Sequence, residues 1–222
     1  MKRMRIITGH YGSGKTEYAV NLALSLVKSG TPTALADLDI VNPYFRSYEQ
    51  AQRLEAAGIR VIVTSCGGAV DMPAIDPAVM SIFQDPKWTG ILDIGGDPVG
   101  AHVLARFVDQ LDPAEFDLLY VLNANRHETR DLDSALLYMQ AIEIACQQKV
   151  TGIVNNTHLC GETTAEDILK GANLAHALSQ RAGIPVVHHA VEHRLLPQVR
   201  DQLAEPILPI EIYMKKPWEI TS

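Results

Sequence analysis

Gly9-His-Tyr-Gly-Ser-Gly-Lys-Thr16 is the stretch that decides the fold of this chain, because it has the glycine, lysine and threonine spacing of a P-loop. Arg5–Thr8 immediately before it is a short run with adjacent β-branched residues, which predicts a strand, and a helical pattern follows from about Lys15. A loop between a strand and a helix points successive backbone N–H groups and the positive helix end at one place. The segment therefore predicts a polyphosphate-binding site.

The residue types within the loop have distinct expected roles. Glycines let the backbone wrap closely around a phosphate, Lys15 reaches the outer phosphates, and the Thr16 hydroxyl holds Mg²⁺. A chance match in a glycine-rich turn is the alternative, and the agreement of motif, preceding strand and following helix argues against it. The predicted nucleotide-binding residues of this segment are Gly9, His10, Tyr11, Gly12, Ser13, Gly14, Lys15, Thr16 and Glu17.

Along the rest of the chain, short aliphatic runs alternate with segments of helical period. Gly30 and Pro32 form a stop signal for the first helix, and Thr163-Thr-Ala-Glu166 is a capping-box pattern for a later one. This alternation predicts a three-layer α/β fold of the P-loop NTPase type, with a mostly parallel seven- or eight-stranded sheet, helices on both faces and one domain over residues 1–222. The expected strands are Arg5–Thr8, Thr33–Leu38, Arg60–Thr64, Gly90–Ile94, Asp117–Leu122, Val150–Asn155 and Pro185–Ala190.

Composition narrows the function classes. With 47% hydrophobic and 20% charged residues, the chain has the balance of a globular protein. Its net charge of -7 argues against nucleic-acid binding, and its apolar amino-terminal run is too short for a signal peptide or a membrane span. Pro217 interrupts any amphipathic helix at the carboxyl end, so no membrane contact is expected. Three cysteines are too few for a disulfide framework, which favours a cytoplasmic location.

Carboxylates stand at the ends of two expected strands. Asp37 and Asp39 close the second strand, and their spacing of two residues puts both on one side. Asp93 closes the fourth strand and is followed by Gly96. Ligands of such sheets bind outside the carboxyl ends of the strands, so these side chains are expected to face the phosphate. A structural role for Asp37, orienting Lys15 or a neighbouring loop, is the open alternative.

These segments, together with Val154-Asn155-Asn156, resemble the MinD/ParA/CobQ-type P-loop ATPases of the SIMIBI class. By that resemblance, Lys15, Asp39 and Asp93 are catalytic, with Asp39 positioning the attacking water and Asp93 serving as the Walker B carboxylate. The resemblance also implies that Gly96 gives its N–H to the γ-phosphate. It further implies that Asn155 contacts the base, although a turn residue is the alternative there. The implied cofactors are ATP and Mg²⁺, with Thr16, Asp39 and Asp93 at the metal.

The chain departs from this family at one position. His10 stands where the MinD and ParA branch carries a second lysine that reaches the phosphates of a partner subunit. A neutral imidazole cannot replace a permanent cation, but a nearby triphosphate would raise its pKa and favour its protonation. A nucleotide-bridged homodimer and a spacer role for His10 are both left open.

Three functions are consistent with these residues. The first is Mg-dependent hydrolysis of ATP that drives a conformational switch or acts on an unknown protein partner. The second is a synthase or kinase of the dethiobiotin synthetase type, which activates a small carboxylate substrate. The third is metallocentre assembly through Cys66, although a lone cysteine is more typical of a core or turn position. No metal beyond Mg²⁺ is assigned to the histidines. ATP is favoured over GTP because the sequence has no Asn-Lys-x-Asp motif.

Overall fold

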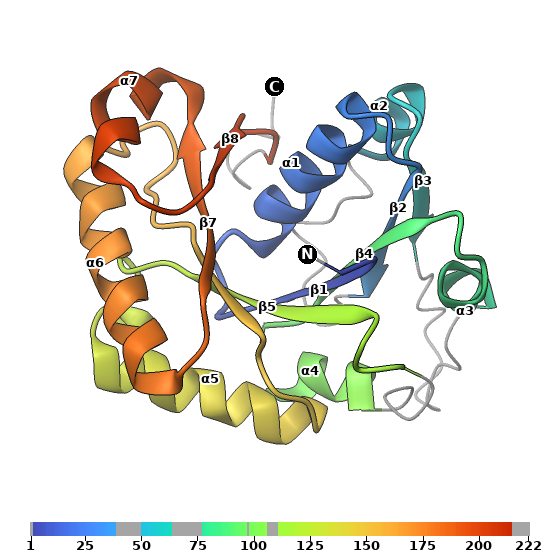
Figure 1. Ribbon diagram of the computed structural model, residues 1–222, viewed down its shortest axis with the longest axis horizontal. Coiled ribbons are helices and arrows are strands. Elements are labelled where there is room, and N and C mark those ends of the chain that lie inside the picture. The colour runs from blue at the N-terminus through green and yellow to red at the C-terminus, as the bar shows by residue number, and fades with distance from the viewer. Residues whose placement is uncertain (1, 39–49, 64–76, 97, 106–110, 215–222) are drawn as a thin grey trace, which may run out of the picture.

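The centre of the protein is one parallel sheet with the strand order β3-β2-β4-β1-β5-β6-β7-β8 (Figure 1). The computed structural model describes residues 2–38, 50–63, 77–96, 98–105 and 111–214. Every pair of neighbouring strands is parallel. The strands are β1 (Met4–Thr8), β2 (Thr33–Leu38), β3 (Arg60–Val63), β4 (Thr89–Ile94), β5 (Phe116–Leu122), β6 (Gly152–Asn155), β7 (Val186–Glu192) and β8 (Ile207–Ile210).

Helices cover both faces of the sheet. One face carries α1 (Lys15–Lys28) and α2 (Ala51–Ala56), which pack on Ile7, Leu35 and Ile91. The other face carries α3 (Pro77–Gln84), α4 (Pro98–Ala105), α5 (Leu132–Cys146) and α6 (Ala165–Ala182). Further helical elements in the described residues are α7 (Leu196–Val199) and the 3₁₀ turns η3 (His127–Thr129), η4 (His193–Leu195) and η5 (Arg200–Gln202).

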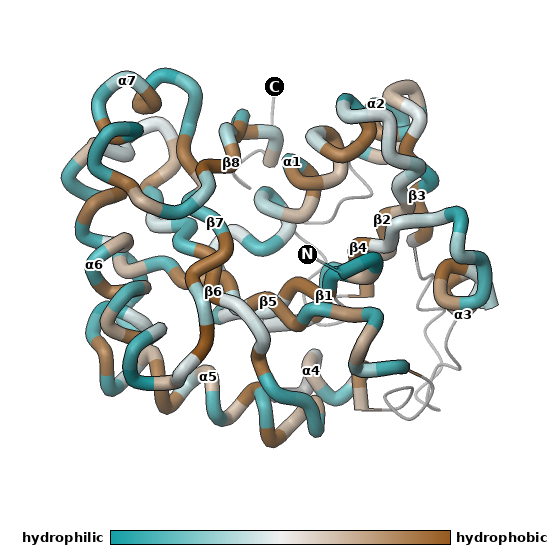
Figure 2. The backbone as a smooth tube through the Cα atoms, in the orientation of Figure 1, coloured by the Kyte–Doolittle hydropathy of each residue, from teal (hydrophilic) through white to brown (hydrophobic). Residues whose placement is uncertain are grey.

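Burial of the strands on both faces explains their sequence. All five residues of β1 and all six of β2 are buried, which matches the short apolar runs that the sequence contains at these positions. Figure 2 shows hydrophobic residues along the central strands and a mixture of hydrophilic and hydrophobic residues along the surrounding helices. The expected three-layer fold with helices on both faces of a parallel sheet is confirmed, and the sheet has eight strands.

Strand β8 was missing from the expected strands. Its four residues Ile207-Leu-Pro-Ile210 are few, and Pro209 argues against a strand when the sequence is taken alone. Among the described strands, β8 pairs with β7 alone and lies at the edge of the sheet, and Pro209 is exposed. A proline is tolerated at an edge because the missing N–H has no partner strand to serve.

The predicted cap of α6 is wrong by one residue. Thr164 is the N-cap, and its side chain accepts from the Asp167 N–H while the Asp167 carboxylate accepts from the Thr164 N–H. Thr163 instead donates its hydroxyl to the Cys160 carbonyl, which fixes the turn before the helix. Helix α4 begins at Pro98, and Asp97 before it lies outside the described residues.

The order in which successive strands are added to the sheet changes side at β1. From β1 the chain moves to β2 and β3, returns to β4 beside β1, and then crosses to β5 on the other side of β1. The loops that follow β1, β4 and β5 therefore meet at the carboxyl edge of the sheet, which is where open α/β sheets bind ligands. Among the described helices, none is long and apolar enough to cross a bilayer.

Candidate functional site

The loop between β1 and α1 depends on glycine at two positions. Gly14 is the N-cap of α1 with φ 83°, and a Cβ there would collide with the Asn156 amide and lie 2.6 Å from His158 Nε2. Gly12 has φ 72°, and a Cβ there would lie 3.1 Å from the guanidinium carbon of Arg126. Neither position accepts a larger residue without strain. The loop is thus held tightly between the start of α1 and the loops that follow β5 and β6.

Lys15 lies inside this loop and close to the end of β4. It is 6% exposed, and its Nζ lies 3.4 Å from the His10 carbonyl oxygen. Gly96, two residues beyond β4, packs so closely that a Cβ would collide with both the Gly9 carbonyl oxygen and Lys15 Nζ. The predicted residues Gly9, Lys15 and Gly96 therefore come together, with the ammonium group between the loop and the β4 end.

Thr16 and Asp93 are in direct contact. The Thr16 hydroxyl donates a hydrogen bond of 2.6 Å to Asp93 Oδ2, and Asp93 is 1% exposed. Asp37 is also buried and lies opposite Asp93 in the register of β2 and β4, so the two carboxyl-bearing residues are neighbours on the sheet. Asp39, predicted as a catalytic and metal residue, lies outside the described residues.

His10 is enclosed rather than free at the tip of the loop. Its Nε2 lies 3.5 Å from a carboxylate oxygen of Glu128, and its ring meets the Tyr138 ring edge to face at 4.8 Å. Burial lowers the pKa of His10 below its usual value, which outweighs the opposing effect of Glu128. Tyr138 also donates its hydroxyl to the Gly96 carbonyl at 2.7 Å. His10 is therefore neutral at pH 7 and links the loop to α5 in this structure.

The loop from β5 to α5 supplies residues that the sequence analysis missed. Arg126 Nε donates a hydrogen bond of 2.7 Å to the Gly12 carbonyl. Asn123 is fully buried and donates to the His158 carbonyl at 3.2 Å. The Asn-x-Asn-Arg sequence that directly follows an apolar strand could have predicted these site residues. Polar residues at the carboxyl end of that strand lie at the same end of the sheet as the P-loop.

The two asparagines at the end of β6 have different surroundings. Asn156 donates to the Ser13 and Gly14 carbonyls at 2.8 and 3.2 Å, so it supports the phosphate loop directly. Asn155 is 0% exposed, donates to the Ile168 carbonyl at 3.1 Å and contacts His189. The side chain predicted to contact the base thus lies in the interior and holds α6 to the sheet, because the strand directs it away from the loop.

Glu17 also lies away from the phosphate side of the loop. Its two carboxylate oxygens accept hydrogen bonds of 2.8 and 3.1 Å from the N–H groups of Tyr213 and Met214. In this structure the Glu17 side chain ties α1 to the segment after β8, and its expected nucleotide contact stays a prediction. The other two predicted loop residues differ in exposure, because Tyr11 is 55% exposed and Ser13 is buried.

Histidines outside the loop form a second polar group. His176, His189 and Glu205 bring their ligand atoms within 4.8 Å of one another. Glu205 accepts from both imidazoles at 2.7 and 2.9 Å, and His189 faces away from His188, as expected for adjacent residues in a strand. The Asn155 amide nitrogen donates one of its hydrogens to the Ile168 carbonyl. Because an amide nitrogen can only donate, its contact with His189 Nδ1 is a second donation, to that ring nitrogen. The proton of neutral His189 is then on Nε2, which donates to the Glu205 carboxylate. Cys66 lies outside the described residues.

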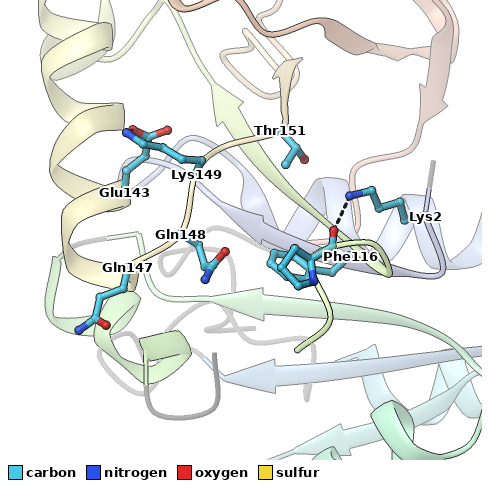
Figure 3. Close-up of a pocket in the computed structure, with 8 residues that line it drawn as sticks. Lys2, Phe116, Glu143, Gln147, Gln148, Lys149 and Thr151 are labelled. Atoms are coloured by element: carbon cyan, nitrogen blue, oxygen red, sulfur yellow. Dashed lines mark hydrogen bonds and ion pairs between the residues drawn. The ribbon is translucent and has the colours of Figure 1, made fainter. Parts of the chain in front are cut away.

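A shallow pocket of about 430 Å³ lies at the amino-terminal ends of the strands, on the opposite side of the sheet from the carboxyl ends that carry the glycine loop. Lys2, Phe116 and Thr151 line it from the starts of β1, β5 and β6, and Glu143 and Lys149 line it from the α5 end (Figure 3). The Glu143 carboxylate is already engaged by Lys149 at 2.7 Å and by the Val150 N–H at 2.9 Å. This pocket has no contact with Lys15, Thr16 or Asp93, so the candidate site is the loop at the carboxyl edge.

Comparison with known proteins supports the fold. No protein-family model and no curated protein matches the chain. Among solved structures, FtsY from Thermotoga maritima is similar with a TM-score of 0.59 and 24% identity, over 85% of this chain and 61% of that one. Chloroplast FtsY from Physcomitrella patens has a TM-score of 0.57 and 19% identity, over 84% of this chain and 57% of that one.

A third similar structure is that of FlhF complexed with GTP and Mg²⁺, with a TM-score of 0.53 and 14% identity. The matched region covers 84% of this chain and 64% of the FlhF chain. The chain thus spans less than two thirds of the length of each of these proteins. The strand order, the glycine loop and these likenesses together give the chain the three-layer α/β fold of P-loop nucleoside triphosphatases.

Proposed function

We propose that this chain is a Mg-dependent P-loop ATPase that hydrolyses ATP to change its own conformation or to act on a partner protein. The observation that carries the proposal is the 2.6 Å hydrogen bond between the Thr16 hydroxyl and Asp93, beside the glycine loop that holds Lys15. The hydroxyl of α1 and the buried carboxylate of β4 thereby lie together beside the glycine loop. The amide N–H groups of such a loop bind an anion.

The residues present fit a magnesium ion. Mg²⁺ prefers oxygen ligands and is usually held by a few protein oxygens together with substrate phosphates. Thr16 and Asp93 supply such oxygens here, and by resemblance Asp39 adds a carboxylate. Bound Mg²⁺ would neutralise charge that develops on the phosphates. Lys15 would place a second positive charge on the outer phosphates, and the loop amides would orient them.

The preference for ATP rests on the sequence. FlhF is similar in fold and was solved with GTP, so guanine nucleotides belong in any test. The chain has no Asn-Lys-x-Asp motif, and Asn156 occupies the β6 end where it bonds the Ser13 and Gly14 carbonyls. We therefore propose ATP as the substrate and the MinD/ParA/CobQ-type ATPases as the related branch.

A nucleotide panel tests this function. The wild-type protein is expected to hydrolyse ATP slowly with Mg²⁺ and without any added small molecule. Lys15→Ala is expected to lose nucleotide binding, whereas Asp39→Ala is expected to keep binding and lose turnover. Normal turnover by Asp39→Ala would exclude the role proposed for that residue, and turnover restricted to GTP would overturn the choice of ATP.

The surroundings of His10 favour a second candidate function. His10 is kept neutral by burial and is bound to Glu128 and Tyr138, so it does not supply the permanent cation of the MinD and ParA branch. A synthase of the dethiobiotin synthetase type, which transfers phosphate to a small carboxylate, has no need of that cation. Phosphate release that appears only with an added carboxylate substrate would support this candidate. Nucleotide-dependent dimerisation would support the switch.

A further inference from the structure

Arg126 lies against the outer side of the phosphate loop. Its Nε donates to the Gly12 carbonyl at 2.7 Å, and the position of a Cβ on Gly12 would be 3.1 Å from Cζ and 3.3 Å from Nη2. The side chain is exposed, and within the described part of the chain Nη1 and Nη2 form no hydrogen bond to protein. Because Arg126 meets a carbonyl oxygen, the guanidinium is outside the nest of inward-facing amides, where a ligand can reach its flat face.

The backbone that carries Arg126 is fixed before any ligand binds. The Arg126 N–H donates to the Asn123 carbonyl at 3.1 Å, and the buried Thr129 hydroxyl donates to the same carbonyl at 2.8 Å. Asn123 in turn is fully buried and bonded to the His158 carbonyl. Because this turn is already formed, its backbone loses little freedom when a ligand binds, which lowers the cost of a contact made from it.

The strand order indicates the direction in which a bound nucleotide would run across the site. The contact of Thr16 with Asp93 and the packing of Lys15 on Gly96 mark the outer phosphates and the metal on the β4 side of β1. In the sheet, β1 separates β4 from β5, and Arg126 follows β5. A nucleotide with its outer phosphates at β4 therefore extends its nucleoside end toward β5 and Arg126.

We propose that the nucleobase stacks on the guanidinium plane of Arg126, an inference that rests on the proposed nucleotide-binding function. Guanidinium is planar, delocalised and weakly hydrated, and it interacts favourably with aromatic faces. The bond from Nε holds one edge of the guanidinium against the Gly12 carbonyl, and the residue as a whole is exposed to solvent. Every base has such a face, so stacking on Arg126 strengthens nucleotide binding without selecting one base.

Equilibrium binding of ATP, GTP and inorganic tripolyphosphate, each with Mg²⁺, tests this contact. Arg126→Ala is expected to raise the Kd of ATP and of GTP about tenfold, as loss of one stacking contact does. The Kd of tripolyphosphate, which has no base, is expected to stay unchanged. Arg126→Lys keeps the charge without the plane and is expected to recover only part of the loss. Arg130→Ala is the matched control, because Arg130 is on the same loop and its side chain is 62% exposed.

The outcomes separate this inference from the proposed function. Equal weakening of ATP and tripolyphosphate by Arg126→Ala would mean that Arg126 acts on phosphates or through the loop, and would overturn stacking. Unchanged ATP binding would overturn it too. Absence of any Lys15-dependent nucleotide binding would instead overturn the proposed function.

Discussion

The Thr16 hydroxyl donates a hydrogen bond of 2.6 Å to Asp93 Oδ2, and this bond joins the first turn of α1 to the end of β4. Residues that are 77 positions apart are thereby held at the same edge of the sheet. Both side chains offer oxygen, and Lys15 beside them offers a positive charge. The pair therefore defines where we expect Mg²⁺ and the outer phosphates to meet.

Removing the Thr16 hydroxyl is expected to weaken the metal-dependent part of binding. Thr16→Ala should lower the affinity for Mg-ATP about tenfold or more, because one Mg²⁺ ligand is lost, and should leave metal-free ATP binding nearly unchanged. Thr16→Ser keeps the hydroxyl and serves as the control. The measurement is titration with ATP in the presence of Mg²⁺ or of a chelator. An equal loss in both conditions would show that Thr16 acts through the loop and not through the metal.

A methyl group at Gly96 is expected to displace Lys15. In Gly96→Ala the new Cβ would collide with the Gly9 carbonyl oxygen and with Lys15 Nζ, so the loop and the ammonium group must shift. We expect at least a tenfold loss of ATP affinity with retention of the fold, measured by titration and by circular dichroism. Gly161→Ala is a suitable control, because nothing lies within 4 Å of its Cβ position. Wild-type affinity in Gly96→Ala would contradict the packing described for the site.

Much of the site could be predicted because it depends on local sequence. The P-loop pattern carries its own strand, turn and helix, and Asp93 and Gly96 follow an apolar run that is typical of a parallel strand. Arg126 and Asn156 could not be placed in the same way. Their contacts with Gly12 and Ser13 depend on how the β5 and β6 ends meet the loop, which only the strand order determines.

The contacts of the Glu17 side chain show a second kind of feature that local sequence does not reveal. Its place directly after Lys15 and Thr16 suggested a ligand contact, but a helix turns by about 100° per residue, so neighbours in sequence face different directions. Glu17 points to the segment after β8, which is 196 residues away along the chain. No local pattern reveals such a partner, and β8 itself is short and contains Pro209.

Truncation of Glu17 is expected to destabilise the protein. Its buried carboxylate accepts hydrogen bonds from the Tyr213 and Met214 N–H groups, and truncation removes the acceptor of both bonds. Glu17→Ala should lower the free energy of unfolding by about 2 kcal/mol. Glu17→Gln should lower it less, because an acceptor oxygen remains and burial already raises the pKa of Glu17, disfavouring the charge. Urea unfolding measures both; equal stability of wild type and Glu17→Ala would refute this role.

His188 is expected to make the stability of the protein depend on pH. Burial lowers the pKa of His188 from 6.5 to about 4, with Arg5 acting in the same direction. The Tyr18 hydroxyl lies 2.7 Å from His188 Nδ1, so Tyr18, which burial keeps protonated by raising its pKa, shares a hydrogen bond with the neutral ring. The unfolded chain thus binds a proton at higher pH than the folded chain. The resulting stability is complete above pH 6.5 and is lost as the pH falls toward 4.

Urea unfolding between pH 7 and pH 5 measures this effect. Each such histidine contributes a slope of up to about 1.4 kcal/mol per pH unit in that window. His188→Gln should reduce the slope, while His158, whose pKa burial also lowers to about 4, maintains part of it. His193→Gln is the control, because His193 is exposed. A slope unchanged by His188→Gln would contradict the assignment.

Calorimetric titration of Mg-ATP into wild type and Lys15→Ala tests the central claim most directly. We predict saturable binding at one site in the wild-type protein and an affinity at least a hundredfold lower in Lys15→Ala. This loss is expected because the ammonium group beside Gly96 is the cation that reaches the outer phosphates. Equal affinity in the two proteins, or no binding by the folded wild type, would contradict the account.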